Sequence, residues 1–182
     1  VCALSDAGAV SCAGVGRHGE ATFPERPPAA LGQGWRALAA GTHHTCGLTD
    51  AGAALCVGAN ETGKLNLPET PPQRGMTAAT WQALTAGDDH TCGLTTQGSI
   101  MCVGANDERQ TDLPERPPAY AKLGRTWKAV GAGARHTCAL TNEGAASCVG
   151  ANDAGQRDLP ERPPDGTGAT WEAVVGGEYH TC

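Results

Sequence analysis

Apolar residues in this chain come in short runs that glycines and polar pairs repeatedly interrupt. One stretch begins with Trp81-Gln82-Ala83-Leu84-Thr85-Ala86, which ends at Gly87 and two aspartates. Two further runs follow at 90–95 and 99–103, separated by Thr96-Gln97-Gly98. Runs of about five or six residues bounded by turn residues are typical of strands rather than of helices. The pattern therefore predicts three strands, at 81–86, 90–95 and 99–103.

The same pattern recurs along the whole chain. Its tryptophans are spaced by 46, 46 and 44 residues, and each is followed nine residues later by a histidine and two residues after that by a cysteine. Only the interval between a Pro-Glu motif and the next tryptophan changes in length. Variation confined to one segment marks that segment as a surface loop. We interpret 1–182 as one partial repeat domain, with units at about 1–44, 45–90, 91–136 and 137–180 and the start of another at 181–182.

A hairpin turn in each unit places two cysteines opposite each other. The turn Thr96-Gln97-Gly98 has equivalents in the other units, and three residues ending in glycine suit a type I turn with a left-handed third position. Folding the hairpin about this turn pairs Leu94 with Ile100 and Cys92 with Cys102. Directly opposed residues are near enough to be bridged. We expect four disulfides and one unpaired cysteine, Cys182; the pairs are Cys2–Cys12, Cys46–Cys56, Cys92–Cys102 and Cys138–Cys148.

Two metal alternatives remain open at this point. His90, Cys92 and Cys102 offer three zinc-type ligands, although no fourth ligand recurs at a fixed spacing. Asn106-Asp107 with Asp112 offers oxygen ligands for calcium, although the spacing fits no Asp-x-Asp-x-Asp loop. We favour disulfides and solvated turns, with no metal. Paired cysteines indicate an oxidising compartment, so we expect a secreted, periplasmic or cell-surface protein.

Composition narrows the functional classes. The net charge is −6 without a basic cluster, which disfavours nucleic acid as a partner. No apolar stretch approaches the ~20 residues of a membrane span, and no phosphate-cradling glycine loop indicates a cofactor. A histidine occupies one frame position in every unit, whereas a catalytic group is normally unique. We therefore expect structural histidines bonded to loop backbone, no catalytic residues and no enzyme activity; the histidines are His44, His90, His136 and His180.

Both faces of the predicted hairpin are small or apolar, so each sheet needs a neighbour on both sides. Cys92 and Leu94 lie on one face, and Gly93 and Met101 on the other. Stacking identical sheets meets this need. A short strand around Asp112-Leu113 would complete a four-stranded sheet, the blade of an all-β propeller.

The recurring motif resembles the regulator of chromosome condensation repeat family. Its elements are Trp-x-x-(Leu/Val)-x-(Ala/Gly)-Gly-x-x-His-Thr-Cys-x-Leu-Thr and Cys-Val-Gly-Ala-Asn-Asp-x-x-Gln-x-Asp-Leu-Pro, with the fullest match from Trp127 to Pro160. The resemblance implies antiparallel four-stranded blades, usually seven in a ring. Because the chain starts and stops inside hairpins, we expect a fragment forming an open arc of about four blades. The paired cysteines resemble those of secreted bacterial members.

The sequence favours a non-catalytic protein-binding scaffold, with the partner and the oligomeric state left open. Contacts would come through the variable loops 29–34, 73–80, 119–126 and 165–170, and in particular through Met76, Tyr120, Lys122 and Arg125. The alternative is a carbohydrate-binding or adhesion propeller, for which the repeat tryptophan is the candidate platform. By family resemblance, guanine nucleotide exchange or β-lactamase inhibition are further, weaker alternatives.

Overall fold

The structure, a computed structural model, describes residues 1–14, 16–73, 78–118, 126–164 and 168–182. Within these ranges the chain forms eleven strands and no helix. The strands are β1 (Cys2–Leu4), β2 (Val10–Cys12), β3 (Trp35–Ala40), β4 (His44–Thr49), β5 (Ala54–Gly58), β6 (Trp81–Ala86), β7 (His90–Thr95), β8 (Ile100–Gly104), β9 (Trp127–Ala132), β10 (His136–Thr141) and β11 (Ala146–Gly150).

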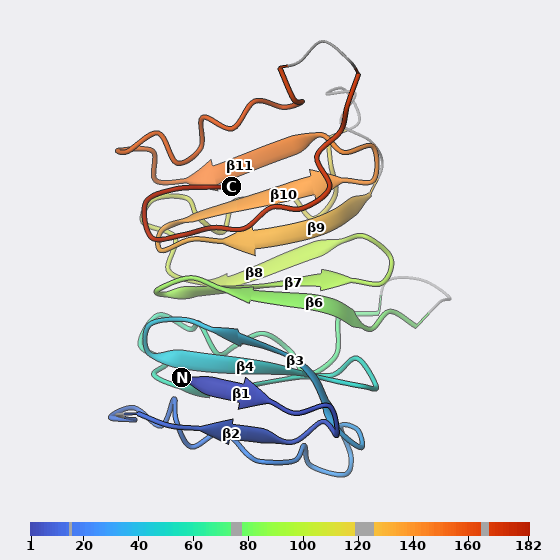
Figure 1. Cartoon of the computed structure of the whole chain (residues 1–182), viewed down its shortest axis with the longest axis vertical. Coiled ribbons are helices and arrows are strands. Elements are labelled where there is room, and N and C mark those ends of the chain that lie inside the picture. The colour runs from blue at the N-terminus through green and yellow to red at the C-terminus, as the bar shows by residue number, and fades with distance from the viewer. Residues whose placement is uncertain (15, 74–77, 119–125, 165–167) are drawn as a thin grey trace.

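The strands form four antiparallel sheets that follow one another along the long axis of the molecule (Figure 1). β1 and β2 make a two-stranded sheet, and the other three sheets have the strand orders β3-β4-β5, β6-β7-β8 and β9-β10-β11. The first strand of each three-stranded sheet contacts the first strand of the next. This is a series of propeller blades in an open arc rather than a closed ring, which confirms the predicted all-β fold.

The observed register in each hairpin is the predicted one. Leu94 pairs with Ile100 and Cys92 with Cys102, and Gly98 in the turn has a φ of 70°. The third strand begins one residue later than expected. Ser99 instead closes the turn, because its backbone N–H donates to Oγ1 of Thr95 and its carbonyl accepts from the Thr95 N–H.

Four disulfides close the four hairpins at the spacing of ten residues. Each joins residues whose Cα atoms lie 4.0–4.1 Å apart, and Cys182 is free and exposed. A sulfur in a disulfide is not a thiolate, so Cys92 and Cys102 cannot ligate zinc in this state. The zinc alternative does not apply to the oxidised chain.

The fourth strand expected around Asp112-Leu113 is reduced to a single contact. The N–H of Ile100 donates to the carbonyl of Glu115 at 2.9 Å, and the other units repeat this bond. Pro114 on one side and Pro117-Pro118 on the other have no N–H to extend a ladder. The described sheets therefore have at most three strands, flanked by an extended segment where a fourth strand was predicted.

In the structure each unit is one sheet together with the loop that follows it, so the units begin at Val1, Trp35, Trp81 and Trp127, and Trp171 begins the next one. The apolar core lies between these units rather than inside them. Trp81, which is fully buried, packs on Leu48, Ala54 and Leu67 of the preceding unit. Its indole Nε1–H donates to the carbonyl of Pro68 at 2.9 Å, and the other three tryptophans make the equivalent bond. The tryptophan thus joins its own sheet to the loop segment of the unit before it.

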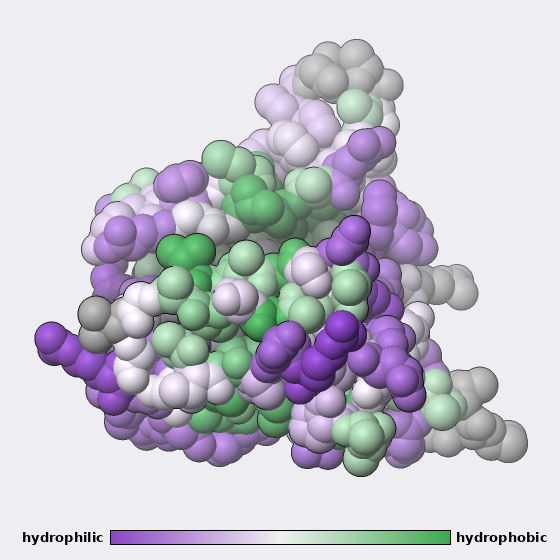
Figure 2. Space-filling model, turned by 60° about the horizontal axis from the view of Figure 1, so that its bottom comes forward, coloured by the Kyte–Doolittle hydropathy of each residue, from purple (hydrophilic) through white to green (hydrophobic). Residues whose placement is uncertain are grey.

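The outer side of the first unit is uncovered. Figure 2 turns this end of the molecule forward and shows apolar residues gathered on it. A hollow of about 660 Å³ lies against the hairpin, lined among others by Leu4, Val10 and Phe23. We call the contact between two consecutive units a joint. At each joint, the neighbouring unit covers the corresponding apolar face. This exposed side is what an open arc predicts for a terminal blade.

We expect the disulfides to stabilise the hairpins measurably. Replacing both Cys92 and Cys102 by alanine should lower the free energy of unfolding by roughly 2–3 kcal/mol, because the bridge closes a short loop in the unfolded chain. Urea unfolding followed by circular dichroism measures this difference. Cys182→Ser is the matched control, since that thiol is exposed and unpaired, and it should leave stability unchanged. Equal stability of all three proteins would contradict the assignment.

Candidate functional site

One end of the stacked sheets gathers two sets of turns and loops from successive units. The turn after the first strand of each sheet and the loop after its third strand meet there, because the N–H of Ala105 donates to the carbonyl of Asp89 and two other units repeat this bond. We call this end the turn face. It consists of residues 16–22, 41–43, 59–66, 87–89, 105–112, 133–135, 151–158 and 177–179.

A glycine fixes the start of each turn. A Cβ on Gly87 would overlap with the ring of His90 and with the carbonyl oxygen of Gly133 in the next unit. The equivalent glycines Gly41 and Gly133 are confined in the same way. Only glycine fits these positions without displacing backbone. The frame of the turn is therefore identical in successive units, whatever residues follow the glycine.

The two residues after this glycine are different in every unit. They are Thr42-His43, Asp88-Asp89, Ala134-Arg135 and Glu178-Tyr179. Several of them interact across the joint between units. The Thr42 hydroxyl donates to Oδ1 of Asp88 at 2.6 Å, and Arg135 pairs with Glu108 at 3.1 Å. The turn face thus presents an ordered, non-repeating set of polar side chains on a repeating frame.

Lys64 is the most unusual residue of this set, since it is only 1% exposed. In the next two units its position holds Gln110 and Gln156, whose side-chain carbonyls accept a local backbone N–H. A lysine has no acceptor, and the Lys64 ammonium instead forms an ion pair with Asp89 of the following unit. A second carboxylate, Glu61, lies 3.8 Å away. The lysine at this position therefore makes a contact between units in place of the hydrogen bond that glutamine makes within the loop.

An asparagine closes each long loop of the turn face. Asn106 accepts from the N–H of Thr111, and its amide group donates to Oδ1 of Asp112 at 2.7 Å. Asn60 and Asn152 close their loops in the same way. The carboxylate considered as a calcium ligand is thus bonded to an amide. Across the described part of the chain, no group of three or more His, Cys, Asp or Glu side chains is placed to hold a metal.

The inner edge of the turn face encloses a hollow of about 520 Å³. Its wall consists mostly of turn glycines and of alanines at the strand ends, and its polar side chains are Thr42, Asp88 and Glu178. The turn face as a whole carries ten of the 19 acidic residues of the chain and five of the 13 basic ones. It therefore accounts for five of the six net negative charges.

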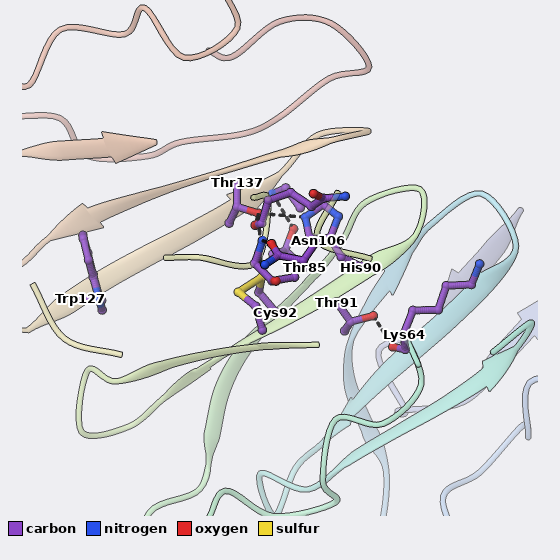
Figure 3. The surroundings of a disulfide bond; sticks show 12 residues. Lys64, Thr85, His90, Thr91, Cys92, Asn106, Trp127 and Thr137 are labelled. Carbon is purple, nitrogen blue, oxygen red and sulfur yellow. Dashed lines mark hydrogen bonds between the residues drawn. A yellow bond between two sulfur atoms is a disulfide. The ribbon is translucent and has the colours of Figure 1, made fainter. Parts of the chain in front are cut away.

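The repeated histidines are structural, but their partner is not the loop backbone that we predicted. Nε2 of His90 lies 2.8 Å from the hydroxyl of Thr137 in the next unit, as Figure 3 shows. His44 and His136 make the same contact. Desolvation by burial lowers the pKa of His44 and His90 to about 4 and also lowers the pKa of His136. All three are neutral at pH 7 and hold adjacent units together.

The residues predicted to bind a partner, Met76, Tyr120, Lys122 and Arg125, lie outside the described residues. The described part of the 73–80 loop is held at its base by Gln73, whose side chain bonds to the N–H and the carbonyl of Ala79. Sequence reasoning missed the turn face, although one signal was present. The pair before each histidine is unlike in every unit of an otherwise regular motif.

The repeat tryptophan cannot serve as a sugar platform in the complete units. Trp35, Trp81 and Trp127 are 3% exposed or less, and each indole N–H is bonded. Among the described residues, Tyr179 is the one exposed aromatic side chain of large size, at 55%. The described surface therefore lacks the set of equivalent aromatic pockets that the carbohydrate alternative requires.

Comparison with known families and structures places these units. Residues 81–110 and 127–156 match the regulator of chromosome condensation (RCC1) repeat, in agreement with the resemblance noted from the motif. No curated protein matches the sequence. No helix in the described residues is long and apolar enough to cross a membrane.

Solved structures share the fold at low sequence identity. The ectodomain of the receptor kinase CR4 from Physcomitrella patens is 23% identical over the whole chain, with a TM-score of 0.66, and 45% of that chain is covered. The CRINKLY WD40 ectodomain of ACR4 from Arabidopsis thaliana is 21% identical over the whole chain, with a TM-score of 0.65 and 58% of that chain covered. Yeast RCC1 (Prp20), solved bound to Kap60, is 18% identical over 99% of this chain, with a TM-score of 0.69 and 50% coverage. The chain spans about half the length of these structures.

The pair of Lys64 and Asp89 can be tested by a double-mutant cycle. Asp89→Ala should destabilise the protein by up to about 3 kcal/mol, because it removes the closest counter-charge of a buried ammonium. Lys64→Gln should cost less than about 1 kcal/mol, since glutamine can make the local bond that Gln110 makes. In the Lys64→Gln background, Asp89→Ala should have little effect. Additive losses in urea unfolding would show that the two residues are not coupled.

Proposed function

Because residues 81–110 and 127–156 match the regulator of chromosome condensation repeat, we propose that this chain is a non-catalytic scaffold that binds a protein partner through its turn face, outside the cell. The observation that carries the proposal is the contrast within each unit. The turn glycine, the histidine and the disulfide keep one geometry, while the adjoining pair of surface residues differs from unit to unit. A repeat protein specifies a partner by varying surface residues on a constant frame.

The order of the turn face supports a role in binding. Three of its loops are closed by asparagine bonds, and Thr42, Lys64 and Arg135 bond across the joints between units. Side chains that are already fixed lose less conformational entropy when a partner binds. A surface of this kind is suited to recognition of one defined shape.

The chemistry of the turn face supports a protein partner with basic groups. Ten acidic residues against five basic ones leave this end with most of the net negative charge of the chain. Charge complementarity accelerates encounter and selects among partners more than it adds affinity. The partner is therefore expected to present lysine or arginine side chains opposite the turn face.

Two observations support an extracellular setting. Four disulfides join cysteines in strands, a feature of proteins that fold in oxidising compartments. Two of the solved structures with the same fold are receptor ectodomains. The secreted, periplasmic and cell-surface settings all meet this condition.

A non-catalytic role is supported by what the reactive side chains do. His44, His90 and His136 bond to threonines in the next unit, and the paired cysteines are oxidised. These side chains, which suggested chemistry in the sequence, are thus engaged in the frame. The variable loops, with Met76, Tyr120, Lys122 and Arg125, stay a proposed second contact region.

The turn face can be tested by moving charge on it. We expect Asp107→Lys combined with Asp153→Lys to slow association with the partner on the order of tenfold at low salt, because both side chains are exposed on that face. The experiment immobilises the chain, identifies the proteins it retains from the extracellular fraction of its source by mass spectrometry, and then measures association rates with the purified protein by surface plasmon resonance.

The control places the same change of charge at the other end of the sheets. Glu143 and Glu172 are exposed there, and Glu143→Lys combined with Glu172→Lys should leave association within a factor of two or so. Equal slowing by both double variants would point to overall charge rather than to the turn face. Full retention by the turn-face variant would overturn the proposed surface.

A further inference from the structure

The joints between units contain a set of buried, unpaired acceptors. His44, His90 and His136 are 0% exposed, and each begins the second strand of its sheet. Nδ1 of each ring has no hydrogen-bond partner among the described residues. Polar atoms buried without a partner are rare in proteins. Three unpaired Nδ1 atoms at equivalent positions in successive joints therefore require a physical explanation.

The bonds around the other ring nitrogen fix which tautomer is present. The Thr137 hydroxyl donates to the carbonyl of Gln110 at 2.8 Å, so it has no further proton to give to His90. Nε2 of His90 must therefore carry the proton and donate to the threonine. Thr91 and Thr181 repeat this arrangement with Lys64 and Gln156. Nδ1 is left as an unprotonated lone pair in each joint.

The packing leaves no room for a second ring proton to be solvated. Gly87 lies against Cε1 and Nδ1 of the His90 ring, so closely that even a methyl group would not fit. Gly41 and Gly133 close the other two rings in the same way. At His44 and His90, a proton on Nδ1 would thus create a buried cation without an acceptor. Such a group is strongly unfavourable unless the site opens to water.

The charged groups that face the rings do not compensate for this loss of hydration. His44 faces Lys64 and His43, which disfavour a positive ring, and Asp89, which favours it. His90 faces His44 and His136, which disfavour the cation, and Asp88 and Asp89, which favour it. The His180 side chain disfavours a positive His136 ring, whereas a backbone hydrogen bond with His180 favours it. Burial is the first cause of the lowered pKa in all three cases.

We propose that the three His–Thr joints form an acid-operated latch: when the rings take up protons, neighbouring units separate while each disulfide-closed hairpin stays intact. The geometry assigns the break to the joints, because the histidine contacts the next unit and the disulfide lies within one unit. In a linear array each unit contacts only its neighbours, so opening one joint separates the chain on its two sides. The turn face, which is assembled across the joints, is lost at the same time.

The pH window follows from the direction of the shifts. The folded pKa of His44 and His90 lies at about 4, below the ordinary value of 6.5, so the opened state binds more protons between these limits. The contribution of the histidines to the stability of the joints is therefore fully present above pH 6.5, and it decreases as the pH falls toward 4. The latch is closed in a neutral medium and opens in an acidic one.

The test follows the joint and the hairpins separately on the purified oxidised chain. Tryptophans lie in the joints, so their emission should shift to the red between pH 6.5 and 4, while far-ultraviolet circular dichroism is retained and neutral buffer restores the original emission. Replacing His44, His90 and His136 by glutamine should remove this shift, because the amide can donate to threonine but cannot ionise. His18→Gln is the matched control, since that ring is exposed and does not face the buried histidines, and it should keep the full shift.

Each alternative result decides against the latch. Unchanged emission of the wild-type chain down to pH 4 would overturn it, and so would a triple variant that opens over the same pH range as the wild type. If the triple variant does not fold, nuclear magnetic resonance of the wild-type imidazole protons gives the answer. The buried histidines must titrate together with the emission change. Their titration in a chain whose emission stays constant would also refute the proposal.

Discussion

The structure depends on one contact, the seating of each unit on its neighbour. A three-stranded sheet of small and apolar residues cannot bury both of its faces alone, so it is stable only when another sheet covers each side. In this chain the joint has an apolar half, where Trp81 packs on Leu48 and Leu67, and a polar half, where His44 bonds to Thr91. The two halves are in the same joint, so they form and break together. The residues that repeat in the sequence form either this joint or the hairpin that contributes to it.

The hairpins were predictable in detail because their determinants are local. The distance between Cys92 and Cys102, the position of Gly98 and the alternation of side chains fix the register with a few residues. The disulfide pairs follow from the register. The fourth strand was not predictable in the same way. A strand there needs backbone donors, and the prolines around Glu115 remove them, leaving one bond where a ladder was expected.

The candidate site was harder to predict because it depends on contacts between units. The sequence shows that His90 recurs, but its partner Thr137 is 47 residues away, and nothing local indicates which group the ring meets. The expectation of a backbone partner was wrong for this reason. We predicted binding through the loops that vary in length, whereas the turn face varies in residue type at constant length. Length variation is easy to see along a sequence, and variation at a fixed position is visible only after the units have been aligned on their frame.

The same turn serves stability and recognition, and the two roles constrain each other. Gly87 allows the His90 ring to approach the next unit, and the residues directly after it, Asp88 and Asp89, are partly exposed at the surface. Surface residues so close to a joint are held rigidly, which favours selective binding. Any structural change in the joint also changes the positions of these residues. Lys64 illustrates the point, since a single side chain on the turn face both replaces a loop bond and couples two units. A binding surface built across joints is therefore only as stable as the weakest joint, and conditions that loosen one joint remove the surface without unfolding the hairpins that carry it.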